Sequence, residues 1–295
     1  MQSLTFKKID AFTGPGSTGN PAGAVYLKAP DQLSPEQMQR IAFECKGWVS
    51  EVGFVARLER NVFWMRYYSS EREVEFCGHA TLAIAYDLVT SNAALRRLPE
   101  IEIHTKNSVL QAFNNIKEED AVYIAAPQAT ERECRIQPEL CSGALGIRQG
   151  TSVKPKAVIN AGLETLIVEV ESLEAVLRVE PDVDELKAFC VTHDIDIVLI
   201  FTGEVATKGC AYRTRVFAPR FGYLEDPATG SGNSAFGYYL IQNGAWSDGV
   251  LTLEQNALSQ NPNLIKLSQS KNESGDRRVR FGGRATVKVK GEYFI

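Results

Sequence analysis

Two predicted helices that are apolar on nearly every side constrain the fold of this chain more than any other feature. The first, at residues 78–89, has Asp87 as its one charged residue, and the second, at residues 230–242, has none. A helix on a protein surface carries a polar stripe that faces solvent. We therefore expect each helix to be buried at the centre of its own half of the protein, wrapped by the strands of that half.

The elements that precede the two apolar helices come in the same order. In the first half, strands are predicted at 7–12 and 22–27, then a helix that starts after Ser34, then strands at 52–55 and 62–68. In the second half, strands are predicted at 156–159 and 163–170, then a helix at 182–190, then strands at 195–201 and 212–217. An internal duplication explains this order most simply. The expected fold is α/β, with two similar halves.

The length of 295 residues suits two domains. We assign residues 1–118 to an N-terminal half, residues 151–279 to a C-terminal half and residues 119–150 to a connecting region. A final strand at 284–289, within the terminal segment 280–295, is a candidate to return to the first half.

Composition and charge exclude several classes of function. The net charge of -4 and the pI of about 5.6 give no general attraction to nucleic acid or to anionic membranes. There is no apolar leader and no apolar run of about eighteen residues, so we expect a cytoplasmic protein without a membrane segment. The 6 cysteines form no Cys-x-x-Cys pair and the 3 histidines lie far apart in the sequence. We therefore expect no metal and no disulfide framework.

The segment 14–19 matches the Gly-x-Gly-x-x-Gly fingerprint of dinucleotide-binding proteins. That fingerprint works only where its last glycine opens a helix, whose N-terminus then binds the pyrophosphate. Here the following residues, 20–27, predict a strand. We expect no nucleotide cofactor.

Both apolar helices begin in glycine-bearing polar turns, at residues 75–81 and 225–233. Glycines allow close approach to a ligand, and the free N–H groups and positive dipole end of a helix start favour a carboxylate or a phosphate. Two such turns that face each other would hold a small acid at both ends.

Each candidate residue also has a purely structural explanation. Asp226 is equally well explained as a cap of the second helix, and His79 alone is more often a core histidine with satisfied hydrogen bonds. On these grounds Cys77 is better explained as an inert buried thiol. Glu51 is harder to explain structurally, because it opens a short strand whose other residues are predicted to be buried on both faces.

Five blocks of sequence, taken together, resemble the PhzF-like family of phenazine-biosynthesis isomerases. They lie at residues 10–13, 19–23, 50–51, 77–81 and 225–232, in the family's order and across most of the chain. The resemblance implies a fold like that of diaminopimelate epimerase, with two pseudo-symmetric α/β halves, each a curved mixed sheet around a central helix, and a site between them. It also implies that no cofactor is used and that the protein is a homodimer.

The resemblance carries over to individual residues. Glu51 matches the proton-shuttling glutamate of the family, and His79 and Asp226 match the polar partners that hold or protonate the substrate. The substrate-binding residues that the resemblance implies are Asn20, Cys77, Gly78, Gly230 and Ser231.

Two departures limit what the resemblance implies. Related epimerases use one cysteine at each helix start; Cys77 matches the first of these, but we align Ala228 with the second, so a two-thiol mechanism is incomplete. The family also carries a Gln-Gly turn followed by Gly-Arg-Pro-Ser, whereas this chain reads Gln255-Asn256 and then 261–263 as Asn-Pro-Asn, without the arginine.

The sequence therefore predicts an isomerase or epimerase that moves a proton between carbons of a small carboxylate-bearing substrate by general acid/base catalysis. A racemase assisted by Cys77 is one alternative. A partner-binding protein that keeps this fold without turnover is another. The presence of Glu51, His79 and Asp226 together argues against a non-catalytic protein.

Overall fold

The computed structural model describes residues 2–148, 150–271 and 275–295. The chain forms two compact units, which are described separately below. Unit 1 comprises Met1–Thr13, Thr18–Ala125 and Gly282–Ile295, and unit 2 comprises Gly14–Ser17 and Ala126–Phe281. The predicted connecting region 119–150 is thus divided between the units. No helix among the described residues is long and apolar enough to cross a membrane.

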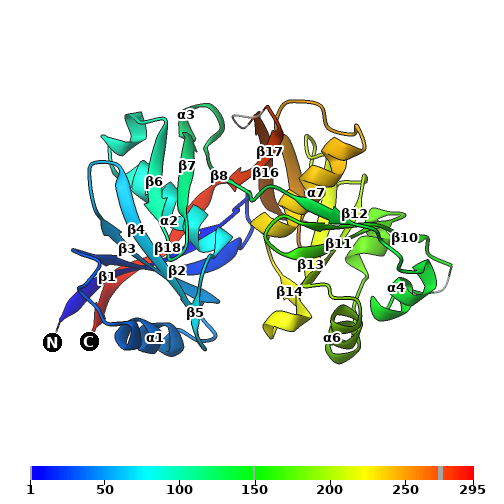
Figure 1. Ribbon diagram of the computed structural model, residues 1–295, viewed down its shortest axis with the longest axis horizontal. Coiled ribbons are helices and arrows are strands. Elements are labelled where there is room, and N and C mark those ends of the chain that lie inside the picture. Colours follow the sequence, from blue (N-terminus) through cyan, green and yellow to red (C-terminus); the bar gives the residue numbers. More distant parts are fainter. Residues whose placement is uncertain (1, 149, 272–274) are drawn as a thin grey trace. The chain divides into compact units, whose positions relative to one another are not determined.

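Unit 1 is a mixed sheet around one central helix (Figure 1). Its strands are β1 (Ser3–Ala11), β2 (Asn20–Leu27), β3 (Glu51–Arg57), β4 (Val62–Ser69), β5 (Glu73–Val74), β6 (Glu100–His104), β7 (Val109–Asn115), β8 (Ala121–Ala125) and β18 (Ala285–Phe294). Its helices are α1 (Pro35–Glu44), the central α2 (Gly78–Ser91), α3 (Ile116–Glu119) and the short η1 (Leu95–Arg97). The C-terminal strand β18 pairs antiparallel with β1, so both ends of the chain lie in this unit.

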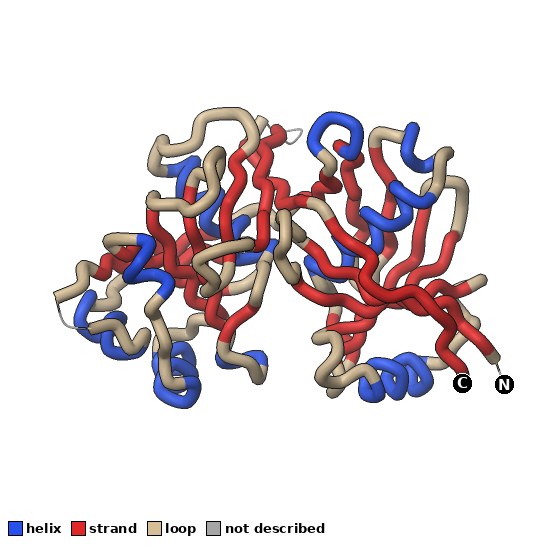
Figure 2. Tube along the Cα trace, turned by 180° about the vertical axis from the view of Figure 1, so that it is seen from behind, coloured by secondary structure: helices blue, strands red, loops and turns tan. Residues whose placement is uncertain are grey.

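Unit 2 is built in the same way (Figure 2). Its strands are β9 (Thr130–Arg132), β10 (Val153–Asn160), β11 (Glu164–Val170), β12 (Ile197–Thr202), β13 (Tyr212–Phe217), β14 (Glu225–Asp226), β15 (Leu251–Gln255), β16 (Asn263–Lys271) and β17 (Arg277–Gly283), the last of which ends in unit 1. Its helices are α4 (Pro138–Ala144), α5 (Leu173–Leu177), α6 (Val183–Thr192), the central α7 (Gly230–Gln242) and the short η2 (Pro219–Phe221).

Strand pairing repeats between the units element by element. In unit 1, β1 pairs antiparallel with β2, β2 parallel with β3, β3 antiparallel with β4, and β4 antiparallel with β5 and parallel with β6. Unit 2 repeats these directions in the same order: β10 pairs antiparallel with β11, β11 parallel with β12, β12 antiparallel with β13, and β13 antiparallel with β14 and parallel with β15. The two-residue strands β5 and β14 each end four positions before the first residue of the central helix. The two units are therefore pseudo-symmetric, as the sequence predicts.

Both central helices are buried on nearly all sides, as their apolar sequences predict. In α2 every residue from Ala80 to Asp87 is buried. The helix packs tightly on β3, because a Cβ on Gly53 would come within 2.4 Å of Cδ1 of Ile84. The carboxylate of Asp87 is neutralised within the unit by Nζ of Lys7, at 2.6 Å and 2.8 Å from its two oxygens. A buried charge is tolerated only with such partners.

The glycine-rich segment 14–19 is a loop between two strands, and Gly19 leads directly into β2. Gly16 and Gly19 have positive φ angles of 73° and 68°, which suit glycine. A Cβ on Gly19 would lie 2.6 Å from the carbonyl oxygen of Ala11. These glycines allow the backbone conformation of the turn. No helix starts here that could bind a pyrophosphate.

Candidate functional site

Glu51 is the first residue of β3, in the middle of the unit 1 sheet. It is paired with Ala22 of β2 on one side and with Ser69 of β4 on the other. The next five residues of β3 are all buried, whereas the Glu51 side chain is 18% exposed. The strand thus places one carboxylate at the edge of an apolar core, where it is partly accessible.

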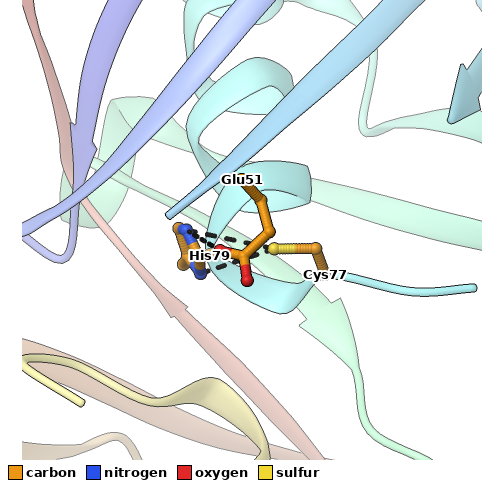
Figure 3. Close-up of side chains that lie close together, drawn as sticks. All are labelled: Glu51, Cys77 and His79. Atoms are coloured by element: carbon orange, nitrogen blue, oxygen red, sulfur yellow. Dashed lines mark hydrogen bonds and ion pairs between the residues drawn. The ribbon is translucent and has the colours of Figure 1, made fainter. Parts of the chain in front are cut away.

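His79 and Cys77 come from the start of α2 and meet Glu51 (Figure 3). Nε2 of His79 lies 3.4 Å from Oε2 of Glu51, and Nδ1 of His79 lies 3.4 Å from Sγ of Cys77. Cys77 is the N-cap residue of α2, but its side chain makes no capping hydrogen bond. The structure therefore brings together three of the residues that the sequence singled out.

Burial lowers the pKa of His79 to about 4, although a hydrogen bond with the backbone of Pro21 opposes the shift. The imidazole is therefore neutral at pH 7 and has one N–H to donate. Pro21 follows Asn20, the buried first residue of β2. The β2 start that contains Asn20 thus borders the same site, as does Gly78, the first residue of α2.

Glu51, Cys77 and His79 also form a group that is able to hold a metal ion. One ligand atom from each side chain lies within 4.8 Å of the others. Thiolate, imidazole and carboxylate are all zinc ligands. The sequence predicts no metal, and the same three groups suit acid/base chemistry equally well.

In unit 2, Asp226 and the start of α7 form a second polar cluster. Asp226 ends β14, and its Oδ2 accepts a hydrogen bond from Oγ1 of Thr229 at 2.6 Å. Thr229, not Asp226, is the N-cap residue of α7, and its side chain makes no capping hydrogen bond. The alternative that Asp226 caps the helix is therefore wrong. The Thr229 hydroxyl is directed to the carboxylate instead.

Gly230 and Ser231 are the first two residues of α7, where N–H groups and the helix dipole favour an anion. Ser231 is partly exposed. Gly230 is buried, and a Cβ there would lie 2.5 Å from the ring of Phe281. Phe281 therefore gives Gly230 a packing role that the sequence did not indicate.

The alignment of Ala228 with the second cysteine of the epimerases is wrong by one position. Cys77 and Thr229 are the N-cap residues of α2 and α7, so Thr229 occupies the equivalent place. The strand registers of the two units agree with this. Val74 pairs with Tyr67 of β4, and Asp226 pairs with Val216, the equivalent residue of β13. The second helix start still carries no thiol, so the two-thiol mechanism stays incomplete.

Sequence reasoning missed two residues of the second cluster. Gln255 and Asn263 face each other across β15 and β16, and both reach the turn before α7. Gln255 donates to the backbone carbonyl of Asp226 at 2.7 Å, and Asn263 donates to that of Pro227 at 2.8 Å. The available signal was their place in the segment that departs from the family's Gln-Gly turn, where the sequence analysis names both without a role.

Comparisons with known proteins cover almost the whole chain. A family model described as phenazine biosynthesis-like protein matches residues 9–291. The protein named antisense-enhancing sequence 1 of Schizosaccharomyces pombe is 27% identical, with 100% of both chains covered. The trans-2,3-dihydro-3-hydroxyanthranilate isomerase of Pseudomonas fluorescens is 31% identical over 80% of this chain and 79% of its own length. Among solved structures, a PhzF-family phenazine biosynthesis protein of Bacillus anthracis superposes with a TM-score of 0.83 at 23% identity, covering 100% of both chains.

Proposed function

Because this chain belongs to the phenazine biosynthesis-like family and is an isomerase, we propose that it moves a proton between carbons of a small carboxylate-bearing substrate. The reaction proceeds by general acid/base catalysis and uses no cofactor. One observation carries the proposal: Glu51, His79 and Cys77 meet at the start of a buried helix.

Glu51 is the proposed acid/base. Its carboxylate takes a proton from one carbon of the substrate, and the electron pair left behind delocalises toward the substrate's own unsaturated groups. The carboxyl group, whose side chain is 18% exposed, exchanges its proton with solvent and then delivers a proton to another carbon, so atoms and charge balance without a co-reactant. Such a group contributes about a hundredfold or more to the rate.

His79 is proposed to orient Glu51 and the substrate rather than to carry charge. At neutral pH the ring is neutral, because burial lowers its pKa to about 4. A neutral imidazole has one N–H donor and one acceptor nitrogen. With its nitrogens 3.4 Å from Glu51 and from Cys77, it fixes the geometry without competing for the carbon-bound proton.

Substrate carboxylates are proposed to bind at the starts of α2 and α7, in a cleft shared by the two units. The pseudo-symmetry supports this, because each unit has its own polar helix start with an N-cap side chain that does not cap the helix. Gly78, Ser231 and the N–H groups beside them are the proposed donors, and Asp226 is the proposed polar partner in unit 2. The name of the Pseudomonas fluorescens relative describes an isomerase of a carboxylic acid, which agrees with a carboxylate-bearing substrate.

A racemase assisted by Cys77 is a second candidate, favoured by the contact of 3.4 Å between its Sγ and His79. It would need a second acid/base on the opposite side of the carbon. At the start of α7 the N-cap residue is Thr229, whose hydroxyl is bonded to Asp226. The thiol mechanism is therefore the weaker candidate.

The proposal is tested by following deuterium uptake from heavy water into a panel of small carboxylic acids. We expect enzyme-dependent uptake at one carbon of at least one unsaturated acid, and slower uptake with Ser231→Ala because a carboxylate donor is lost. Ala235→Ser, on the same helix, reports the cost of changing a buried residue of α7 away from its start. No exchange with any acid, in a protein that is folded, would contradict the proposed function.

A further inference from the structure

The side chain of Gln255, at the end of β15, is fully buried against the start of α7. Its Oε1 accepts hydrogen bonds from the backbone N–H of Thr229, at 3.0 Å, and from Nδ2 of Asn233, at 2.7 Å. Its Nε2 donates to the backbone carbonyl of Asp226, at 2.7 Å, and to Oγ1 of Thr229, at 3.2 Å. One amide group therefore holds both ends of the turn from Asp226 to Thr229.

These contacts set the direction of the Thr229 hydroxyl. Because Nε2 of Gln255 donates to Oγ1 of Thr229, the hydroxyl proton is left to be donated onward. It goes to Oδ2 of Asp226, at 2.6 Å. A chain of hydrogen bonds thus runs from Gln255 through Thr229 to the carboxylate that the proposed function places beside the substrate.

Unit 1 shows that the fold itself does not need this network. In the pairing of β4 with β6, Trp64 lies opposite His104, and both residues are partly exposed. The equivalent pairing of β13 with β15 places Arg213 opposite Glu254, one pair before Gln255. A partly exposed pair without opposite charges in one unit thus corresponds to a fully buried ion pair in the other.

Arg213 secures the chain that follows Gln255. Its guanidinium lies 3.0 Å from Glu254 and donates to the backbone carbonyl and the side chain of Asn256, both at 3.2 Å, and to the carbonyl of Leu258. Asn256 has φ 142°, a conformation that favours glycine, and it stands where the family carries the glycine of its Gln-Gly turn. A buried ion pair adds little net stability over apolar residues of similar volume, so stability alone does not explain its presence here.

We propose that Gln255, held in place by Arg213, is a positioning residue for the reaction. It acts through Thr229 and Asp226 and does not itself touch the substrate. The inference rests on the proposed role of Asp226 at the site.

Two substitutions separate the functions of the amide. Gln255→Glu keeps the hydrogen bonds accepted from Thr229 and Asn233 but loses both donors, and Gln255→Met loses all four bonds at similar volume. Gln269→Glu is the matched control, because Gln269 on β16 donates a long hydrogen bond, of 3.4 Å, to the carbonyl of Trp246. On protein shown to be folded, we expect Gln255→Glu to lower kcat at least about tenfold, the effect of one misdirected hydrogen bond, with a smaller change in KM. The control should change neither.

A double variant distinguishes positioning from a general loss of stability. Thr229→Val breaks the same chain of hydrogen bonds, whereas Thr229→Ser keeps the hydroxyl and should recover most of the parent kcat. If Gln255 acts through Thr229, Gln255→Glu with Thr229→Val is no slower than the slower single variant, because residues of one network are not additive.

Three results would overturn the inference: a folded Gln255→Glu with parental kcat, rate losses that multiply in the double variant, or equal rates for Thr229→Val and Thr229→Ser. If the Gln255 variants do not fold, the comparison of Thr229→Val with Thr229→Ser tests the inference alone. A parent protein that exchanges no proton would refute the proposed function as well, and this is seen before any variant is made.

Discussion

Nε2 of His79 lies 3.4 Å from Oε2 of Glu51, and the same ring places Nδ1 3.4 Å from Sγ of Cys77. One imidazole thus links the two groups that compete for the role of acid/base. Because the ring is buried and neutral at pH 7, the chemistry is decided by the carboxylate and the thiol.

The first prediction concerns the pH dependence of stability. Burial holds the pKa of His79 at about 4 in the folded protein, below the ordinary value of 6.5. Between these two values the unfolded chain binds a proton that the folded protein does not, so stability is lost as the pH falls. We expect proton uptake by His79 in the unfolded chain to lower the free energy of unfolding by about 3 kcal/mol as the pH falls from 7 to 4.

Urea denaturation of the parent and of His79→Gln checks this prediction. The stability advantage of the parent over the variant should shrink by that amount as the pH is lowered. His104→Gln, at an exposed histidine of unit 1, serves as the control. An advantage that stays constant from pH 7 to pH 4 would show that His79 is not held neutral.

The second prediction concerns Cys77. If Glu51 is the acid/base, Cys77→Ser should keep kcat within about threefold, because serine is also a favourable N-cap residue. Proton exchange into the substrate, measured by NMR, gives the rate. A loss of about a hundredfold or more would move the chemistry to the thiol.

The third prediction concerns the packing of Gly230. A Cβ there would lie 2.5 Å from the Phe281 ring, so Gly230→Ala should lower the free energy of unfolding by about 1–3 kcal/mol, the usual cost of overpacking. Gly143 lies in α4 with nothing within 4 Å of an added Cβ, so Gly143→Ala should not destabilise the protein. Equal unfolding midpoints for the two variants would contradict the packing role of Gly230.

The fourth prediction concerns cofactors. Proton exchange should be unchanged after dialysis against a chelator, because the proposed step needs only a carboxylate base. Added zinc should inhibit it, since Glu51, Cys77 and His79 have ligand atoms within 4.8 Å of one another. Activity that is lost on dialysis and restored by a metal would show instead that the group is a resident metal centre.

Much of the fold followed from the sequence because its signals were local. The missing polar stripe of residues 78–89 and 230–242 predicted the buried central helices. Ser34 and Gln37 predicted the start of α1, where the structure shows a complete capping box. The repeated order of elements predicted the pseudo-symmetry, which now extends to strand direction and register.

The parts that could not be predicted depend on contacts between distant positions. Nothing near Gly230 in sequence indicates the ring of Phe281, and nothing near Gln255 indicates that its amide holds the turn before α7. The place of Thr229 as the N-cap residue depends on where the helix begins, which sequence patterns locate only to within a few residues. The strand that follows the glycine fingerprint at 14–19 was predicted correctly, because the residues after Gly19 could be read locally.

The most direct test of the central claim is the rate of proton exchange catalysed by Glu51→Gln. The substitution keeps the size of the side chain and removes the base, so exchange from heavy water into the substrate should fall at least about a hundredfold while folding and substrate affinity persist. Glu102→Gln, on β6 of the same unit, is the control for removing a carboxylate elsewhere. If Glu51→Gln exchanges at the parental rate while Cys77→Ala does not exchange, the thiol is the acid/base and the assignment of Glu51 is wrong.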